Sequence, residues 1–222
     1  MACPGSMESA DELYELMLAL ERHIGLDGLG HPRTLAIAKS LAVAFWRAGE
    51  INQAVSLLDQ VLDQLNSSSG LDHPMKAELL STLSEILFEQ GHLAYASAVQ
   101  RDALESRLRH SGENDPSSLE AKGDLATILF ALGQAEEAAR IEQEAFERAR
   151  THLDMTHPVR CVLAWNRALF HERNGDPDAA RRIVAGELAW LLAEDPFRLG
   201  GVEHSIRSLV CEKLNWNRSV KC

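Results

Sequence analysis

The chain has 222 residues, of which 45% are hydrophobic and 25% charged, so a core can form without disulfides or structural metal. Its 33 acidic residues outnumber 22 basic ones, and the formal charge of −11 opposes binding to nucleic acid or anionic membrane. No apolar run approaches the roughly 20 residues of a transmembrane helix, and we expect a soluble, cytoplasmic protein.

The first predicted element is a helix over residues 8–24. Its apolar positions are Leu13, Leu16, Met17, Leu20 and Ile24. Their three-and-four spacing is typical of an amphipathic α-helix. Residues 1–6 resemble an added leader, so we assign residues 7–30 to a leading helix and a glycine-rich connector.

Three residue types then recur every 42 residues. The prolines are Pro32, Pro74, Pro116 and Pro158; the glycines are Gly49, Gly91, Gly133 and Gly175; the alanines are Ala54, Ala96, Ala138 and Ala180. One period shared by three residue types indicates a repeat array. We place the repeats at residues 31–72, 73–114, 115–156 and 157–194.

Each repeat is predicted to be a pair of helices. Apolar residues at helical spacing lie on both sides of each periodic glycine, which supplies the left-handed conformation that commonly ends a helix. Proline is tolerated in the first turn of a helix, so each periodic proline marks a helix start. The polar run Asn66 to Gly70 is expected to break the second helix of the first repeat.

Small residues and a last helix complete the predicted array. The small residues at one position of each first helix are Ala42, Ser84, Ala126 and Ala168, and they let the paired helix approach closely. Leu209 continues the periodic leucines Leu41, Leu83 and Leu125. We therefore expect a capping helix within residues 195–217 and a tail over residues 218–222.

The repeats resemble the tetratricopeptide repeat, and in particular its kinesin light chain subclass. The resemblance rests on Leu-Ala in the first helix, glycine at the turn, alanine five residues later, and the His-Pro start seen in Leu71 to Pro74. It covers residues 30 to about 195. It implies an all-α, right-handed solenoid of four full repeats plus a leading and a terminal helix. It also implies binding of a peptide or protein segment in the concave groove lined by the first helices.

The resemblance assigns the groove positions by counting back from each turn glycine. They are Lys39, Val43, Trp46 and Arg47; Ser81, Glu85, Phe88 and Glu89; Asp124, Thr127 and Phe130; and Trp165, Asn166, Leu169 and Arg173. In kinesin light chains, an asparagine nine residues before the glycine often clamps the ligand backbone. Asn166 matches that asparagine, whereas Ser40, Thr82 and Asp124 occupy the other three positions.

Trp46, Phe88 and Phe130 form a periodic line of aromatic residues. A row of large apolar side chains on an open surface suggests a ligand site, although packing against a neighbouring helix would also explain it. Acidic residues lie near the middle of the line. A partner with an apolar anchor and a basic flank would suit this pattern.

The remaining motifs give little sign of chemistry. His31, His73 and His157 precede the repeat prolines and are expected to cap helices. No histidine pair has the spacing of a helical zinc site, so neither metal nor cofactor is expected. The cysteines, Cys3, Cys161, Cys211 and Cys222, lack paired spacing and are predicted to be reduced. Glutamates 136, 137, 142, 144 and 147 are assigned to a solvated face.

The leading hypothesis is a non-catalytic protein-interaction module. The alternative is a small-molecule sensor or enzyme with a pocket near the fourth repeat. Its candidate residues are Cys161, Trp165, Asn166, His171, Glu172 and Arg173. A third hypothesis is self-association through the terminal helix, by way of Ile206, Leu209, Val210, Leu214 and Trp216.

Overall fold

The computed structural model describes residues 4–69 and 73–213, and within these ranges the chain is helical and contains no β-strand. The all-α class predicted from the sequence is confirmed. None of the helices in this part is both long and apolar enough to cross a membrane. The chain forms two compact units, Met1–His110 and Ser111–Cys222, and each is described by itself.

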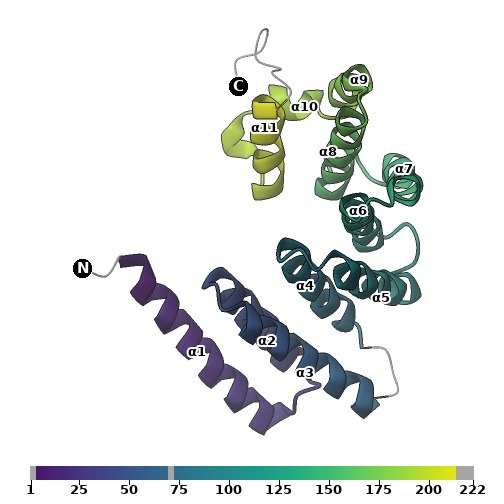
Figure 1. Ribbon diagram of the computed structural model, residues 1–222. Coiled ribbons are helices and arrows are strands. Elements are labelled where there is room, and N and C mark those ends of the chain that lie inside the picture. Colours follow the sequence, from purple (N-terminus) through teal and green to yellow (C-terminus); the bar gives the residue numbers. More distant parts are fainter. Residues whose placement is uncertain (1–3, 70–72, 214–222) are drawn as a thin grey trace. The chain divides into compact units, whose positions relative to one another are not determined.

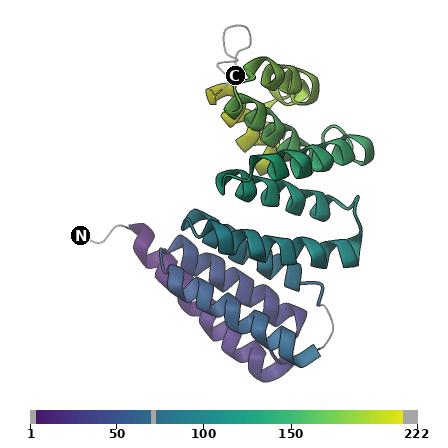
Figure 2. The same cartoon turned by 45° about the vertical axis from the view of Figure 1, so that its right-hand side comes forward.

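The first unit is a stack of neighbouring helices (Figures 1 and 2). Its helices are α1 (Pro4–Asp27), α2 (Pro32–Arg47), α3 (Ile51–Ser69), α4 (Lys76–Glu89) and α5 (Leu93–Ser111). Helix α1 packs on α2, α2 on α3, and α3 on α4. The Ser84 hydroxyl of α4 donates a hydrogen bond of 3.0 Å to the Ala96 carbonyl of α5. Each successive helix therefore covers the apolar stripe of the one before it.

Helix α3 is longer than predicted. It continues through Ser69, so the expected break at Asn66 is wrong. Asparagine and serine disfavour a helix by only a few tenths of a kcal/mol each relative to the best helix formers. A few such residues do not stop a helix whose preceding turns are well packed.

The second unit repeats the pattern. Its elements are α6 (Pro116–Ala131), α7 (Ala135–His152), α8 (Pro158–Arg173), α9 (Pro177–Glu187), α10 (Ala189–Ala193), the 3₁₀ turn η1 (Pro196–Arg198) and α11 (Gly201–Lys213). Helix α8 contacts α6, α7, α9 and α11. The second helix of the fourth repeat is broken at Leu188, whose φ is −114°. Gly186, just before the break, costs a helix about 1 kcal/mol relative to alanine.

The periodic glycines end the first helix of each pair, as predicted. Gly49, Gly91, Gly133 and Gly175 have φ of 82°, 78°, 84° and 81°. At the first of these turns the amide of Glu50 bonds the carbonyl of Phe45 over 2.8 Å, which satisfies a carbonyl that the helix end would otherwise leave open. The amide of Gly49 also bonds the carbonyl of Trp46, over 2.9 Å. The same pair of backbone hydrogen bonds closes the turns after α4, α6 and α8.

The residue before each periodic proline caps a helix start. Nδ1 of His31 and His157 accepts a hydrogen bond of 3.2 Å from the amide two residues later, and the Asp115 carboxylate does the same over 2.9 Å. The histidines are therefore structural at these positions. His73 differs slightly: it bonds the Met75 amide, but α4 begins only at Lys76.

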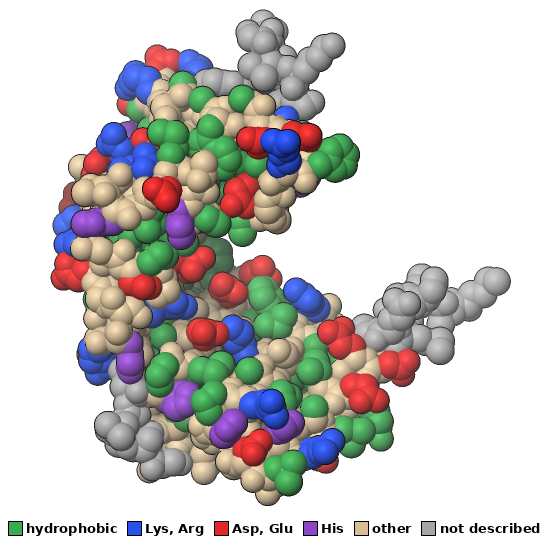
Figure 3. Space-filling model, turned by 180° about the vertical axis from the view of Figure 1, so that it is seen from behind, with side chains coloured by type: hydrophobic (Ala, Val, Ile, Leu, Met, Phe, Trp, Pro, Cys, Tyr) green, Lys and Arg blue, Asp and Glu red, His purple; other side chains and the backbone are tan. Residues whose placement is uncertain are grey.

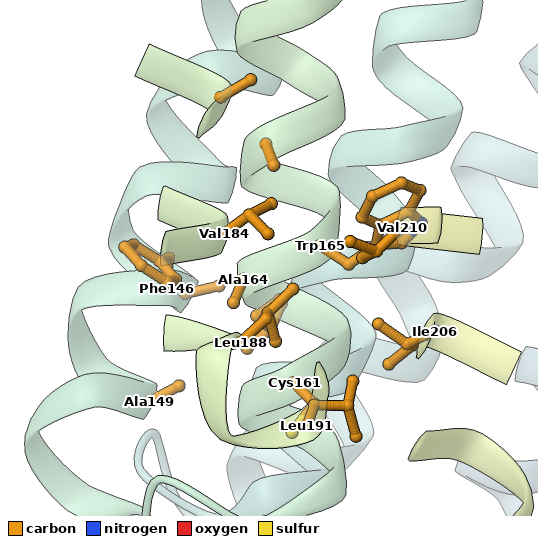
Figure 4. Packing of buried hydrophobic residues seen from close by; sticks show 14 of the residues in the cluster. Phe146, Ala149, Cys161, Ala164, Trp165, Val184, Leu188, Leu191, Ile206 and Val210 are labelled. Atoms are coloured by element: carbon orange, nitrogen blue, oxygen red, sulfur yellow. The ribbon is translucent and has the colours of Figure 1, made fainter. Parts of the chain in front are cut away.

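A cluster of buried side chains joins α8 to its neighbours in the second unit (Figure 4). Trp165 lies in this cluster beside Val210 of α11 and is only 5% exposed. Ile206, one turn earlier on α11, is also buried. Helix α11 therefore covers part of the face that α8 would otherwise present to solvent.

The cysteines depart from the sequence prediction at one position. Cys161 is a free thiol buried in the same cluster, and its burial raises its pKa to about 11. Cys211 is disulfide-bonded, so the prediction of reduced cysteines is wrong there. Neither residue is available as a thiolate at neutral pH.

Candidate peptide-binding surfaces

The predicted groove residues of the first unit lie on α2 and α4, two helices in contact. We call them the unit 1 surface: Lys39, Val43, Trp46, Arg47, Ser81, Glu85, Phe88 and Glu89. The aromatic side chains of Trp46 and Phe88 are half-buried, while the charged side chains of Arg47, Glu85 and Glu89 are exposed. The surface therefore combines apolar area with a charged rim.

Side-chain bonds between helices hold this surface in place. The Trp46 indole donates a hydrogen bond of 3.1 Å to Glu89, linking α2 to α4. Lys39 pairs with Glu78 over 2.5 Å in the same way. Both bonds are exposed to solvent, so each contributes at most about 1 kcal/mol. Their main effect is to fix the two helix faces relative to each other.

The predicted residues of the second unit gather around one hollow between α6 and α8. It has a volume of about 90 Å³. Its lining residues are Ala126, Thr127, Phe130, Glu142, Asn166, Leu169, Phe170 and Arg173. Five of these were predicted from the sequence; we call Thr127, Phe130, Asn166, Leu169 and Arg173 the unit 2 surface. Asp124, also predicted, is half-buried on α6 and does not line the hollow.

Aromatic packing shapes one wall of the hollow. The Phe130 ring meets the Phe170 ring edge-on, with centroids 5.2 Å apart, and the Arg173 guanidinium lies 5.7 Å from the Phe130 centroid. Edge-on pairs and cation–π contacts each contribute about 1 kcal/mol. Phe130 therefore packs on Phe170 of α8 and remains half-buried, so packing against a neighbouring helix and a place on an open surface both apply to it.

Glu142, which the sequence pattern did not single out as a site residue, lines the same hollow from α7. It was assigned to a solvated face, and that is wrong because the residue is only 3% exposed. Its Oε2 accepts a hydrogen bond of 2.5 Å from Arg167. Burial raises the pKa of this carboxyl, although the hydrogen bond from Arg167 opposes the shift. The repeat could have indicated that Glu142 is buried, because the equivalent positions of the other three repeats hold Leu58, Gln100 and Val184, and two of these are apolar.

The residues proposed for a sensor or enzyme pocket are not brought together. Trp165 and Cys161 lie in the buried cluster, so we leave Trp165 out of the unit 2 surface. His171 lines a different hollow from Asn166 and Arg173, and burial lowers the pKa of its imidazole. Among the described residues, no group of three or more His, Cys, Asp or Glu side chains could hold a metal ion.

The apolar face of the terminal helix is used within the second unit. Ile206 and Val210 are buried, and Leu209 packs against the same cluster. Leu214 and Trp216, the other residues proposed for self-association, lie outside the described residues. On the face shown in Figure 3, acidic and basic side chains are mixed.

Comparisons with known proteins agree with this architecture. Two tetratricopeptide repeat models match residues 34–109 and 118–158, together more than half of the chain. The chain belongs to the tetratricopeptide repeat family. Tetratricopeptide repeats are typically non-catalytic interaction scaffolds, and this chain is a protein-interaction scaffold in that general sense. None of the curated proteins matches the sequence.

Solved structures place this tetratricopeptide repeat chain with kinesin light chain-like folds. A Q17M variant from Podosopora anserina, described as a kinesin light chain with nearly identical TPR-like repeats, has 21% identity and a TM-score of 0.70; the match covers 83% of this chain and 87% of that one. BtubC (BKLC) from P. vanneervenii has 17% identity and a TM-score of 0.74, over 96% and 91% of the two chains. At these identities the likeness concerns the fold.

Proposed function

We propose that the chain binds an extended peptide or protein segment on its first helices, at the unit 1 surface or at the unit 2 surface, each taken by itself. The observation that carries the proposal is the hollow between α6 and α8. Five positions chosen by counting from the turn glycines line it, and it is partly apolar and preformed. Concave, partly apolar sites with a few convergent polar groups are where ligands bind most often.

The chemistry of the unit 1 surface favours an apolar anchor flanked by a basic residue. Phe88 supplies apolar area, and the exposed carboxylates of Glu85 and Glu89 lie three residues before it and one after it on α4. Charge complementarity of this kind contributes mainly to association rate and to the choice of partner. An acidic segment would meet repulsion at the same place.

Asn166 is the residue best placed to hold the backbone of the bound segment. It is half-buried on α8 and lines the hollow, and its carboxamide has both a donor and an acceptor. Thr82, at the equivalent position of α4, instead donates to the Glu78 carbonyl of its own helix. We therefore propose that backbone clamping is concentrated in the second unit.

The test is a selection of peptides from a random display library, followed by affinity measurements with Phe88→Ala and Phe130→Ala variants. Phe197→Ala is the matched control, because Phe197 is 98% exposed on η1 and belongs to neither surface. We expect at least a tenfold loss of affinity in one or both surface variants, the loss of an ordinary hot spot. Selected peptides whose binding survives both changes would show that the surfaces are not the site.

We also propose that the chain acts without catalysing a reaction, in line with the general behaviour of the tetratricopeptide family. Its cytoplasmic location stays a prediction from sequence composition, and fractionation of cells that express a tagged chain tests it.

A further inference from the structure

Helix α1 carries four large apolar side chains that remain exposed to solvent. Tyr14, Met17, Leu18 and Ile24 are between 42% and 61% exposed. Spacings of three, four and seven residues place them on one side of the helix, and we call them the α1 face. Leu20 is buried, so another side of the same helix supplies the contact with the rest of the first unit.

This face is unlike the outer surface of a capping helix. Helix α1 is the first helix of the stack in its unit and packs on α2 (Figure 1). The end element of a repeat array normally presents a polar outer surface to water. The last helix, α11, instead buries its apolar Ile206 and Val210. A row of large apolar residues left open on an end helix indicates a surface that another molecule covers.

The shape of the α1 face suits another α-helix. Side chains three and four residues apart form ridges along a helix, and a second helix packs its own ridges into the grooves between them. Helices α2 and α3 continue the stack from α1 by successive helix-on-helix contacts. A segment that extended the stack beyond α1 would therefore present an apolar helical stripe to the α1 face.

The charged residues beside the α1 face are mostly acidic. Glu21 lies within the face and Asp11 and Glu15 border it, whereas Arg22 is the single arginine or lysine of the helix. Within the described part of the chain, none of these three carboxylates pairs with a basic side chain. The helix dipole favours acidic residues in the first turn alone, and all three lie beyond it. Their place beside an exposed apolar face therefore favours a basic partner.

Other occupants fit the charges less well. A second copy of the chain, with its formal charge of −11, would bring the same carboxylates against Glu15 and Glu21. An anionic membrane surface would meet the same repulsion. Opposite charges across an interface speed association and suppress wrong partners, so a helix with basic flanks is the occupant that this surface selects.

We propose that the α1 face binds an amphipathic helix of a partner protein, which places its apolar stripe on this face and lysine or arginine side chains against Glu15 and Glu21. Helices that dock in this way are held by apolar anchors at helical spacing. The inference goes beyond the proposed function, because that function concerns surfaces on α2, α4, α6 and α8.

The test uses a helical peptide of about 18 residues, made of leucine at helical spacing and lysine elsewhere. Its affinity for the full chain is measured by fluorescence anisotropy. Tyr14→Ala and Leu18→Ala should each weaken binding about tenfold, as at an ordinary hot spot. Alanine is the best helix former, so both variants keep α1 folded. The matched control is Tyr95→Ala, which deletes a 49% exposed ring on α5 and should leave the affinity unchanged.

A second set of measurements tests the charges. Glu21→Gln should weaken binding about threefold, the effect of one exposed ion pair. Glu120→Gln is its control, because Glu120 is an exposed glutamate on α6 in the second unit. The same peptide with glutamate in place of lysine should bind at least about tenfold more weakly.

An affinity that is unchanged in Tyr14→Ala and Leu18→Ala would overturn the inference, as would equal affinity for the lysine and glutamate peptides. A loss confined to Phe88→Ala would assign the peptide to the unit 1 surface, which rejects this inference and leaves the proposed function standing. Light scattering that gives a dimer for the wild-type chain and a monomer for Leu18→Ala would assign the face to a second copy, and would also overturn the inference.

Discussion

Replacing Arg167 by leucine tests the buried ion pair, because it leaves Glu142 without its partner. The carboxyl is 3% exposed, while the Arg167 side chain is 17% exposed. Breaking a buried pair by removing one partner costs about 3–5 kcal/mol. The new leucine regains some apolar burial, so we expect the free energy of unfolding at pH 7 to fall by about 3 kcal/mol.

The loss should depend on pH. Without the arginine, burial alone raises the folded-state pKa of Glu142 above its ordinary value of 4.5. Between the two pKa values the folded state binds more protons than the unfolded state, so stability falls as pH rises. The deficit of Arg167→Leu should therefore grow between pH 5 and pH 7, by up to about 1.4 kcal/mol per pH unit.

Urea unfolding followed by tryptophan fluorescence at pH 5, 6 and 7 measures this deficit. The double variant with Glu142→Leu should recover the stability of the wild-type chain or exceed it, with no added pH dependence. An Arg167→Leu variant that is as stable as wild type at pH 7, or equally destabilised at all three values, would refute the reasoning.

Three further predictions concern the framework of the second unit. His157→Ala should lower the free energy of unfolding by about 1 kcal/mol through loss of its cap, whereas His157→Asp, which copies Asp115, should not; equal losses in denaturant unfolding would rule out the cap. A hydrogen bond from Lys122 lowers the pKa of Glu144 below 4.5, so Glu144→Gln should reduce the free energy of unfolding by a constant amount near neutral pH. This deficit should vanish as the pH falls through the lowered pKa of the folded state, and a deficit that persists at pH 2 in urea unfolding would contradict the reasoning. At pH 8, Cys161 should react with iodoacetamide at least about 100-fold more slowly in the folded chain than in urea, since its pKa is about 11 instead of 9.0, and equal labelling by peptide mapping would show that the thiol is accessible.

Local patterns were sufficient for most of the helices and for most of their ends. Gly49 adopts a left-handed conformation because the turn after α2 requires it. Glycine adopts this conformation readily, so its position alone indicates the turn, without knowledge of the residues packed around it. The caps at His31 and Asp115 are equally local, since donor and acceptor are two residues apart. The sequence pattern does not reveal the break at Leu188, because the break depends on a small difference in free energy between a helical and a non-helical turn.

Burial within the second unit was harder to predict. Phe130 and Trp165 both occupy positions expected to face the groove, yet α11 covers Trp165 while Phe130 stays half-buried beside the hollow. The difference in burial arises because different helices pack on the helix that carries Phe130 and on the helix that carries Trp165. A count along the chain gives the face of a helix and says nothing of what is packed on that face.

The sequence by itself determined the repeat and the helix boundaries to within a few residues at most positions. It also placed Thr127, Phe130, Asn166, Leu169 and Arg173 on the first helices of their pairs. These follow from periodicity and from the backbone preferences of glycine and proline, which act over a few residues. Only the tertiary structure decided that these side chains line one hollow, that Glu142 is buried in it, and that Arg167 holds one oxygen of that carboxylate. Those outcomes depend on contacts between helices far apart in the chain, where the same residue type is solvated or buried according to what lies opposite.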